Sequence, residues 1–159
     1  MIQHPIQPVF DNDSQILILG SFPSVKSREE GFFYGHPQNR FWRVLAAVCE
    51  DAVPVTIEEK KAFLHRNHIA VWDVIQSCDI EGSADSSIKN VVPNDLTGIM
   101  DSTNIGQIYV NGKKAEQLYK KYIFPRIGRK AICLPSTSPA NAAWNLERLI
   151  KEWKSILRI

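Results

Sequence analysis

The sequence predicts a three-layer α/β/α sandwich around a central four-stranded, mostly parallel sheet. Four short apolar runs are nearly continuous rather than alternating, as expected for parallel strands covered on both faces. Between them lie segments with the 3.6-residue period of amphipathic helices. Because strands and helices alternate along residues 1–159, we expect one α/β domain.

The elements are expected in a regular order. The strands are predicted at residues 16–19, 69–74, 107–110 and 131–134. The helices are predicted at residues 41–48, 57–66, 113–122 and 146–157. Thr56 and Glu59 form a capping box before the second helix, and Ser138 with Pro139 is the expected start of the last one. Residues 77–94 show no clear period and are expected to form a functional or mobile loop.

Composition excludes several classes of protein. No apolar stretch approaches the roughly 18 residues that a membrane span needs, and the first residues lack a secretory pattern, so a cytoplasmic location is expected. The 3 cysteines are widely spaced without a CxxC pair, which argues against a disulfide framework, a zinc site or an iron–sulfur cluster. A net charge of +2 permits a nucleic-acid partner without requiring one.

Candidate site residues follow the predicted strands. Ligands of parallel sheets bind at the carboxyl ends of the strands, which here are residues 20–24, Asp73, Asn111 and residues 135–141. The turn at residues 20–24, GSFPS, matches neither GxGxxG nor a P-loop, so a nucleotide cofactor is not expected.

Two loops add chemistry to this edge. Residues 31–42, GFFYGHPQNRFW, mix aromatic and amide side chains, which suits a pocket that sandwiches a planar base; the alternative is a loop that caps the core. The hydroxyls of Ser136, Thr137 and Ser138 at a predicted helix start favour a phosphate, although helix capping needs only one of them.

Five segments together resemble the uracil-DNA glycosylase superfamily, and most of all its hypoxanthine-DNA (deoxyinosine) glycosylase branch. They are GSFPS, YGHPQNRFW and LPSTSPAN, with WDVIQSC and GSADSSI between them, so the resemblance spans nearly the whole chain. It implies excision of a deaminated base from DNA, with no metal and no cofactor.

The first motif departs from other branches of that superfamily. They carry a catalytic Asp, Asn or Glu just before the motif's proline, where this chain has Ser21 and Phe22. In the branch it resembles most, the catalytic role falls to the asparagine of HPQNRFW, which is Asn39 here. Without the resemblance, Asn39 reads as a helix N-cap. His36 could assist when protonated or serve structure alone.

The resemblance and the chemistry of base excision assign roles to these residues. Asn39 is expected to position water through its amide carbonyl, and backbone N–H groups of residues 20–24 to bind the six-position carbonyl of hypoxanthine. Phe22 or Phe33 would stack on the base, and Asp73 or Asn111 would read its edge. The remaining base contacts are expected from Gly20 and Ser21.

The DNA backbone is expected to bind the late segment. Contacts are predicted from Pro135, Ser136, Thr137, Ser138 and Lys113, with Lys114 and Arg40 as further phosphate partners and Leu134 or a neighbour as a wedge into the stack. Neither of the two main motifs contains a lysine amine for β-elimination, so hydrolysis alone is predicted.

Three alternatives stay open at this point. The same fold could act on uracil in G·U mismatches. The missing first-motif residue could mark a catalytically silent module that binds damaged DNA. The pocket could also hydrolyse free inosine, in which case DNA affinity would show no salt dependence. A monomer is expected in each case.

Overall fold

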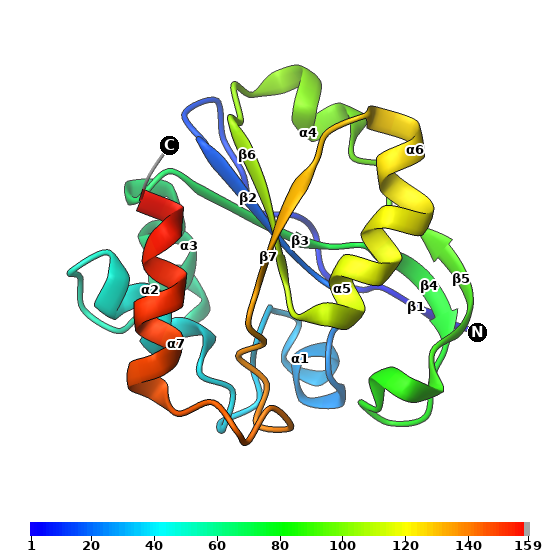
Figure 1. Cartoon of the computed structure of the whole chain (residues 1–159), viewed down its shortest axis with the longest axis horizontal. Helices are drawn as coiled ribbons and strands as arrows, with labels where there is room; N and C mark the ends of the chain where they lie inside the picture. The colour runs from blue at the N-terminus through cyan, green and yellow to red at the C-terminus, as the bar shows by residue number, and fades with distance from the viewer. Residues whose placement is uncertain (158–159) are drawn as a thin grey trace.

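The computed structural model describes residues 1–157, and its centre is a parallel sheet (Figure 1). The sheet has the order β3-β2-β6-β7, and each neighbouring pair is parallel. Its strands are β2 (Ile16–Gly20), β3 (Ile69–Asp73), β6 (Gln107–Asn111) and β7 (Ala131–Leu134). All four lie within two residues of their predicted bounds, and the predicted four-stranded parallel sheet is confirmed.

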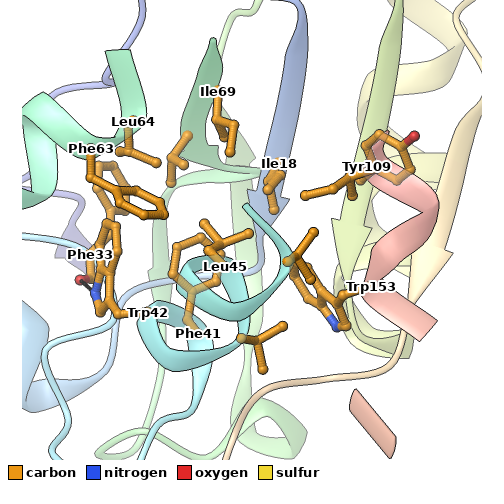
Figure 2. Packing of buried hydrophobic residues seen from close by; sticks show 14 of the residues in the cluster. Ile18, Phe33, Phe41, Trp42, Leu45, Phe63, Leu64, Ile69, Tyr109 and Trp153 are labelled. Carbon is orange, nitrogen blue, oxygen red and sulfur yellow. Dashed lines mark hydrogen bonds between the residues drawn. The ribbon is translucent and has the colours of Figure 1, made fainter. Parts of the chain in front are cut away.

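Helices cover both faces of this sheet and create two separate cores. In Figure 1, α2 (Phe41–Val48), α3 (Ile57–Arg66) and α7 (Leu146–Trp153) lie on one side, and α5 (Lys113–Leu118) and α6 (Phe124–Ile127) on the other. Ile16 and Ile18 of β2 point into the first core, which Figure 2 shows closely, whereas Leu17 and Leu19 point into the second. The alternation within one strand places a layer of helices against each face, which confirms the three-layer sandwich.

Residues 77–94 are not the irregular loop that we expected. They complete β4 (Ile75–Asp79) and contain η1 (Asp85–Ser87) and β5 (Lys89–Pro93). Together with β1 (Ile2–Gln3), β4 and β5 form a second sheet, antiparallel, in the order β1-β4-β5. Register shifts between β4 and β5 break the alternation that would identify them, and the third strand comes from the distant N-terminus.

The helix ends agree with the prediction in one case and differ in another. Thr56 and Glu59 form the expected capping box of α3. The last helix, however, begins at Leu146 with Asn145 as its N-cap, so Ser138 is not its cap. The segment between β7 and α7 is therefore a loop, and the macrodipole of α7 does not act on residues 136–138.

Shorter helices complete the chain. They are α1 (Val25–Glu30), α4 (Thr97–Ser102), the π-helical turn η2 (Tyr119–Ile123), which joins α5 to α6, and η3 (Lys154–Leu157) after α7. Cys78 is buried, whereas Cys49 and Cys133 are partly exposed, and all are free thiols. Across residues 1–157, no helix is both long enough and apolar enough to span a bilayer.

Candidate active site

A cavity of about 320 Å³ opens at the carboxyl ends of the parallel strands, within the size range of ligand sites. The loops after β2 and β7 contribute to its wall, together with Asp73 and Asn111, the last residues of β3 and β6. It brings together most of the residues predicted from sequence: Gly20, Ser21, Phe22, Phe33, His36, Asn39, Asp73, Asn111, Ser136, Thr137 and Ser138. Pro135 and Lys113 do not line it. Sequence reasoning missed two residues with ionisable side chains in the wall, Tyr34 and Asp85.

Asn39 is held in a fixed orientation at this wall. Its Oδ1 accepts the Phe41 backbone N–H at 2.9 Å and the Thr137 hydroxyl at 2.8 Å. Because a backbone N–H can only donate, the carbonyl end of the amide must face Phe41. Asn39 is thus bound by the start of α2, although Arg40 occupies the N-cap position of that helix.

This orientation revises the expected role of the Asn39 carbonyl. An amide oxygen has two lone pairs, and both are already used within the protein. The Nδ2 group, in contrast, donates to no acceptor within residues 1–157, and it is accessible to solvent. The end of Asn39 available to a water or a substrate is therefore its N–H donor.

Thr137 links Asn39 to Asn111 across the cavity. Its hydroxyl accepts from Asn111 Nδ2 at 3.0 Å, and its backbone N–H donates to Asn111 Oδ1 at 3.1 Å. Thr137 is only 1% exposed, so its hydroxyl cannot make the expected contact with a DNA phosphate. Asn111 has both ends of its amide engaged with Thr137, which leaves it less free to read a base than Asp73.

Asp73 lies on the cavity floor with one free oxygen. Its Oδ2 accepts from His4 Nε2 at 2.7 Å, and Oδ1 has no hydrogen-bond partner within residues 1–157. A Cβ built on Gly20 would lie 2.5 Å from this Oδ1 and 2.9 Å from the Tyr34 hydroxyl. A side chain at position 20 would thus collide with both groups, which explains why glycine ends β2.

Gly20→Ala is therefore expected to lower both activity and stability. The added methyl must displace the Asp73 carboxylate or the Tyr34 ring, and such overpacking costs about 1–3 kcal/mol. Thermal unfolding and base-excision rates measure the two effects. Gly98→Ala is the matched control, because a Cβ there meets nothing within 4 Å. Equal behaviour of the two variants would contradict the close packing at Gly20.

Tyr34 is the aromatic residue that the motif reading overlooked. Its ring stacks on Phe41 with centroids 3.8 Å apart, and its hydroxyl is buried without a partner within residues 1–157. Burial, followed by the charge of Asp73, raises the pKa of this hydroxyl far above its ordinary value, so Tyr34 stays protonated. Its φ of 53° is uncommon for a bulky residue, a strain often found at functional sites.

Asp85 enters from the loop before β5, in a segment that carried part of the resemblance. The Ser21 hydroxyl donates to its Oδ1 at 3.1 Å, and the backbone N–H of Val25 donates to Ser83 of the same loop at 2.9 Å. Burial raises the pKa of Asp85 above its ordinary value, while Ser21 and then Lys114 lower it. The carboxyl group of Asp85 thus lies beside Ser21. Ser21 itself stands in the first motif, where related branches carry a catalytic side chain.

The two phenylalanines differ in their access to the cavity. Phe33 is 1% exposed and packs against Phe32 in the core, whereas Phe22 is 9% exposed. Phe22 is consequently the better candidate for stacking on a planar ligand.

His36 Nδ1 accepts from the Gln38 backbone N–H at 3.1 Å, which leaves its Nε2 as the outer nitrogen at the cavity wall.

The late segment presents two of its three hydroxyls to the outside. Ser136 and Ser138 each accept a backbone N–H two residues ahead at 3.1 Å, which leaves both O–H groups able to donate. The carbonyl of Pro135 accepts from the Trp153 indole at 2.9 Å and anchors the segment to α7. Lys113 is exposed at the first turn of α5.

Two predicted DNA contacts are wrong. Leu134 is 3% exposed within the core and cannot wedge into a base stack. The Arg40 guanidinium donates to the backbone carbonyls of Ser138 at 2.9 Å, Asn141 at 3.2 Å and also Trp144, so it holds the loop rather than a phosphate.

Comparison with known proteins agrees with this arrangement. Residues 7–157 match the model of the uracil DNA glycosylase superfamily. The chain is 34% identical over 160 residues to a hypoxanthine DNA glycosylase of Methanosarcina acetivorans, covering 99% of both proteins. It is 35% identical over 136 residues to a hypoxanthine DNA glycosylase of Methanosarcina barkeri, covering 84% of this chain and 85% of the other.

A solved structure extends the agreement to the fold. A solution NMR structure of a Methanosarcina acetivorans protein described as a candidate uracil DNA glycosylase has 34% identity and a TM-score of 0.84, covering 99% of this chain and 98% of the other. Sequence and fold thus point to one family. The chain belongs to the uracil DNA glycosylase superfamily.

Proposed function

We propose that this protein is a DNA glycosylase that hydrolyses the N-glycosidic bond of deaminated bases in DNA, with hypoxanthine as the main substrate. The observation that carries the proposal is the pairing, in one cavity, of a free carboxylate oxygen on Asp73 with a free amide N–H on Asn39. The names of the Methanosarcina relatives support the choice of hypoxanthine.

Substrate binding begins with a flipped nucleotide. A target base inside a duplex is out of reach, so it must leave the stack and enter the cavity. There Phe22 stacks on the base and Asp73 Oδ1 accepts the ring N–H that hypoxanthine presents. Backbone N–H groups of the turn at residues 20–24 bind the six-position carbonyl. Adenine has a lone pair in place of that N–H and is repelled by the carboxylate.

Bond cleavage then depends on charge stabilisation rather than on a strong base. The sugar becomes an oxocarbenium ion while negative charge develops on the leaving base. Asn39 donates its Nδ2 hydrogen to the oxygen of the attacking water, whose other lone pair faces the sugar. His36 Nε2 donates to the leaving base. An amide cannot remove a proton, so the mechanism is dissociative, and the proton that the water loses on attack passes to the departing base anion.

Hydrolysis alone is expected from the residues around the site. A β-elimination step requires an amine close to the sugar, and among residues 1–157 the cavity wall contains no lysine. The hydroxyls of Ser136 and Ser138 bind the phosphates on either side of the flipped nucleotide, with Lys113 as a further contact. Action as a monomer in the cytoplasm stays a prediction.

A strand-cleavage assay tests the proposal. End-labelled duplexes carrying one inosine, uracil or xanthine are incubated with the protein, and abasic sites are converted to breaks with alkali. We expect inosine to be processed fastest and no breaks before alkali. Faster cleavage at uracil would instead assign the protein to the mismatch-specific type.

Two further outcomes separate the remaining alternatives. Tight binding of inosine DNA without abasic product would identify a silent binding module. Release of base from free inosine, with DNA affinity that does not respond to salt, would identify a nucleoside hydrolase.

A further inference from the structure

His4, outside every motif, lies directly behind the cavity floor. Pairing of β1 with β4 brings it there, and its backbone N–H donates to Gln76 O at 2.6 Å. Its imidazole Nε2 lies 2.7 Å from Asp73 Oδ2, and the two side chains are only 2% and 5% exposed. An N-terminal residue thus forms a buried pair with the carboxylate that faces the ligand.

The hydrogen bonds of His4 define which nitrogen carries the proton. Nδ1 accepts from the Ile6 backbone N–H at 3.1 Å, so Nδ1 holds a lone pair and Nε2 holds the hydrogen. The ring also packs edge-on against Phe22 and Trp72, with centroids 5.8 Å and 6.3 Å away. His4 is therefore a donor that cannot easily rotate away from Asp73.

This arrangement makes the other oxygen of Asp73 a directed acceptor. A lone carboxylate could rotate or present either oxygen, but Oδ2 is occupied by His4 and Oδ1 lies above Gly20. The absence of a side chain at Gly20 provides the space that Oδ1 occupies. His4, Asp73 and Gly20 together direct one acceptor into the cavity.

We propose that His4 is a positioning residue for base selection, and that the His4–Asp73 pair restricts excision to bases with a ring N–H beside a carbonyl. The inference rests on the proposed function. Hypoxanthine, xanthine and uracil share this edge, whereas adenine and cytosine present a bare ring nitrogen whose lone pair faces the carboxylate. The pair thus accepts hypoxanthine and uracil and rejects their parents, adenine and cytosine, whereas guanine shares the edge of xanthine and is not separated from it by this contact.

Two His4 variants and two substrates test this role. His4→Phe keeps an aromatic ring for the packing but removes the donor, whereas His4→Gln retains an N–H donor on a side chain of similar reach. Single-turnover excision is measured on duplexes carrying inosine or deoxynebularine, whose purine has a bare N1 and no carbonyl. The quantity compared is the change in the ratio of the two rates between wild type and variant, in which the intrinsic leaving ability of each base cancels.

His4→Phe is expected to lower the inosine-to-nebularine ratio by about ten- to a hundred-fold, the value of one hydrogen bond to a charged group. His4→Gln is expected to restore most of it. A purely structural role would slow both substrates equally, and an unchanged ratio in His4→Phe would overturn the inference. So would a failure of His4→Gln to differ from His4→Phe.

Asp73→Ala provides a second route if His4→Phe does not fold. We expect it to lower the same ratio; where His4→Phe folds, the double variant with His4→Phe should show no lower ratio than Asp73→Ala alone, since His4 acts through Asp73. An unchanged ratio in Asp73→Ala, or an additional loss in the double variant, would overturn the inference. Absence of inosine excision by the wild type overturns the proposed function as well, whereas excision with unaltered ratios overturns the His4 role alone.

Discussion

Asn39→Ala is expected to lower base excision from inosine DNA by about a hundred- to a thousand-fold, the loss seen when one positioned donor is removed from a catalytic site. The Nδ2 group is the free end of this amide, and alanine has nothing to replace it. DNA binding should persist because the contact proposed for Asn39 is with the reacting centre rather than with the DNA backbone. Single-turnover rates and duplex affinity, measured on the same samples, separate the two properties.

Asn39→Asp is the matched control for this prediction. A carboxylate still accepts from the Phe41 N–H and the Thr137 hydroxyl, so the start of α2 and the link to Thr137 are retained. It has no N–H to donate. We therefore expect Asn39→Asp to fold normally and to be nearly as inactive as Asn39→Ala. Substantial activity in Asn39→Asp would contradict a donor role and favour water activation by an oxygen.

Arg40→Ala is expected to destabilise the fold by about 3 kcal/mol, since several carbonyls lose a charged donor at once. For a chain of this size, the unfolding midpoint should fall by about 6–12 °C. Activity should fall as well, because the released loop carries Ser138 and follows Thr137 in the cavity wall. Calorimetry and excision rates measure the two effects.

Arg40→Lys distinguishes this role from phosphate binding. Lysine keeps the charge but lacks the planar fork that reaches several carbonyls, so we expect it to behave like Arg40→Ala. If Arg40 bound a phosphate instead, the alanine variant would retain its stability and lose DNA affinity, with a weaker dependence on salt. That pattern would contradict the loop-holding role.

The location of the site was predictable because it follows from the topology. Parallel strands end at one edge, so the residues at the carboxyl ends of β2, β3 and β6 had to converge there. Gly20, Asp73 and Asn111 were found in this way, each at the last position of its strand. Asn39 and His36 lie outside the strands and were found through the resemblance.

The chemistry of individual side chains was harder to predict. The run of Ser136, Thr137 and Ser138 reads as three equivalent hydroxyls, yet the structure buries the middle one and leaves the outer two able to donate. Arg40 reads as an exposed cation, but its partners are carbonyls about one hundred residues later in the chain. No local pattern contains contacts at such separation.

The N-terminus illustrates the same limit for the fold. β1 has two residues, too few for a periodic signal, and its partner strand lies more than seventy residues away. Because that pairing places His4 against Asp73, missing the strand also meant missing the residue. Tyr34 was visible within the motif, but only the structure shows its buried hydroxyl and its contact with Phe41.

Direct detection of the released base tests the central claim, which is hydrolytic removal of hypoxanthine from DNA at this cavity. Wild type and Asn39→Ala are each incubated with a duplex carrying one inosine, and free bases are quantified by mass spectrometry alongside abasic sites. We predict one hypoxanthine for each abasic site with the wild type, and nearly none with Asn39→Ala. No free hypoxanthine from the wild type, or equal release by both proteins, would contradict the account.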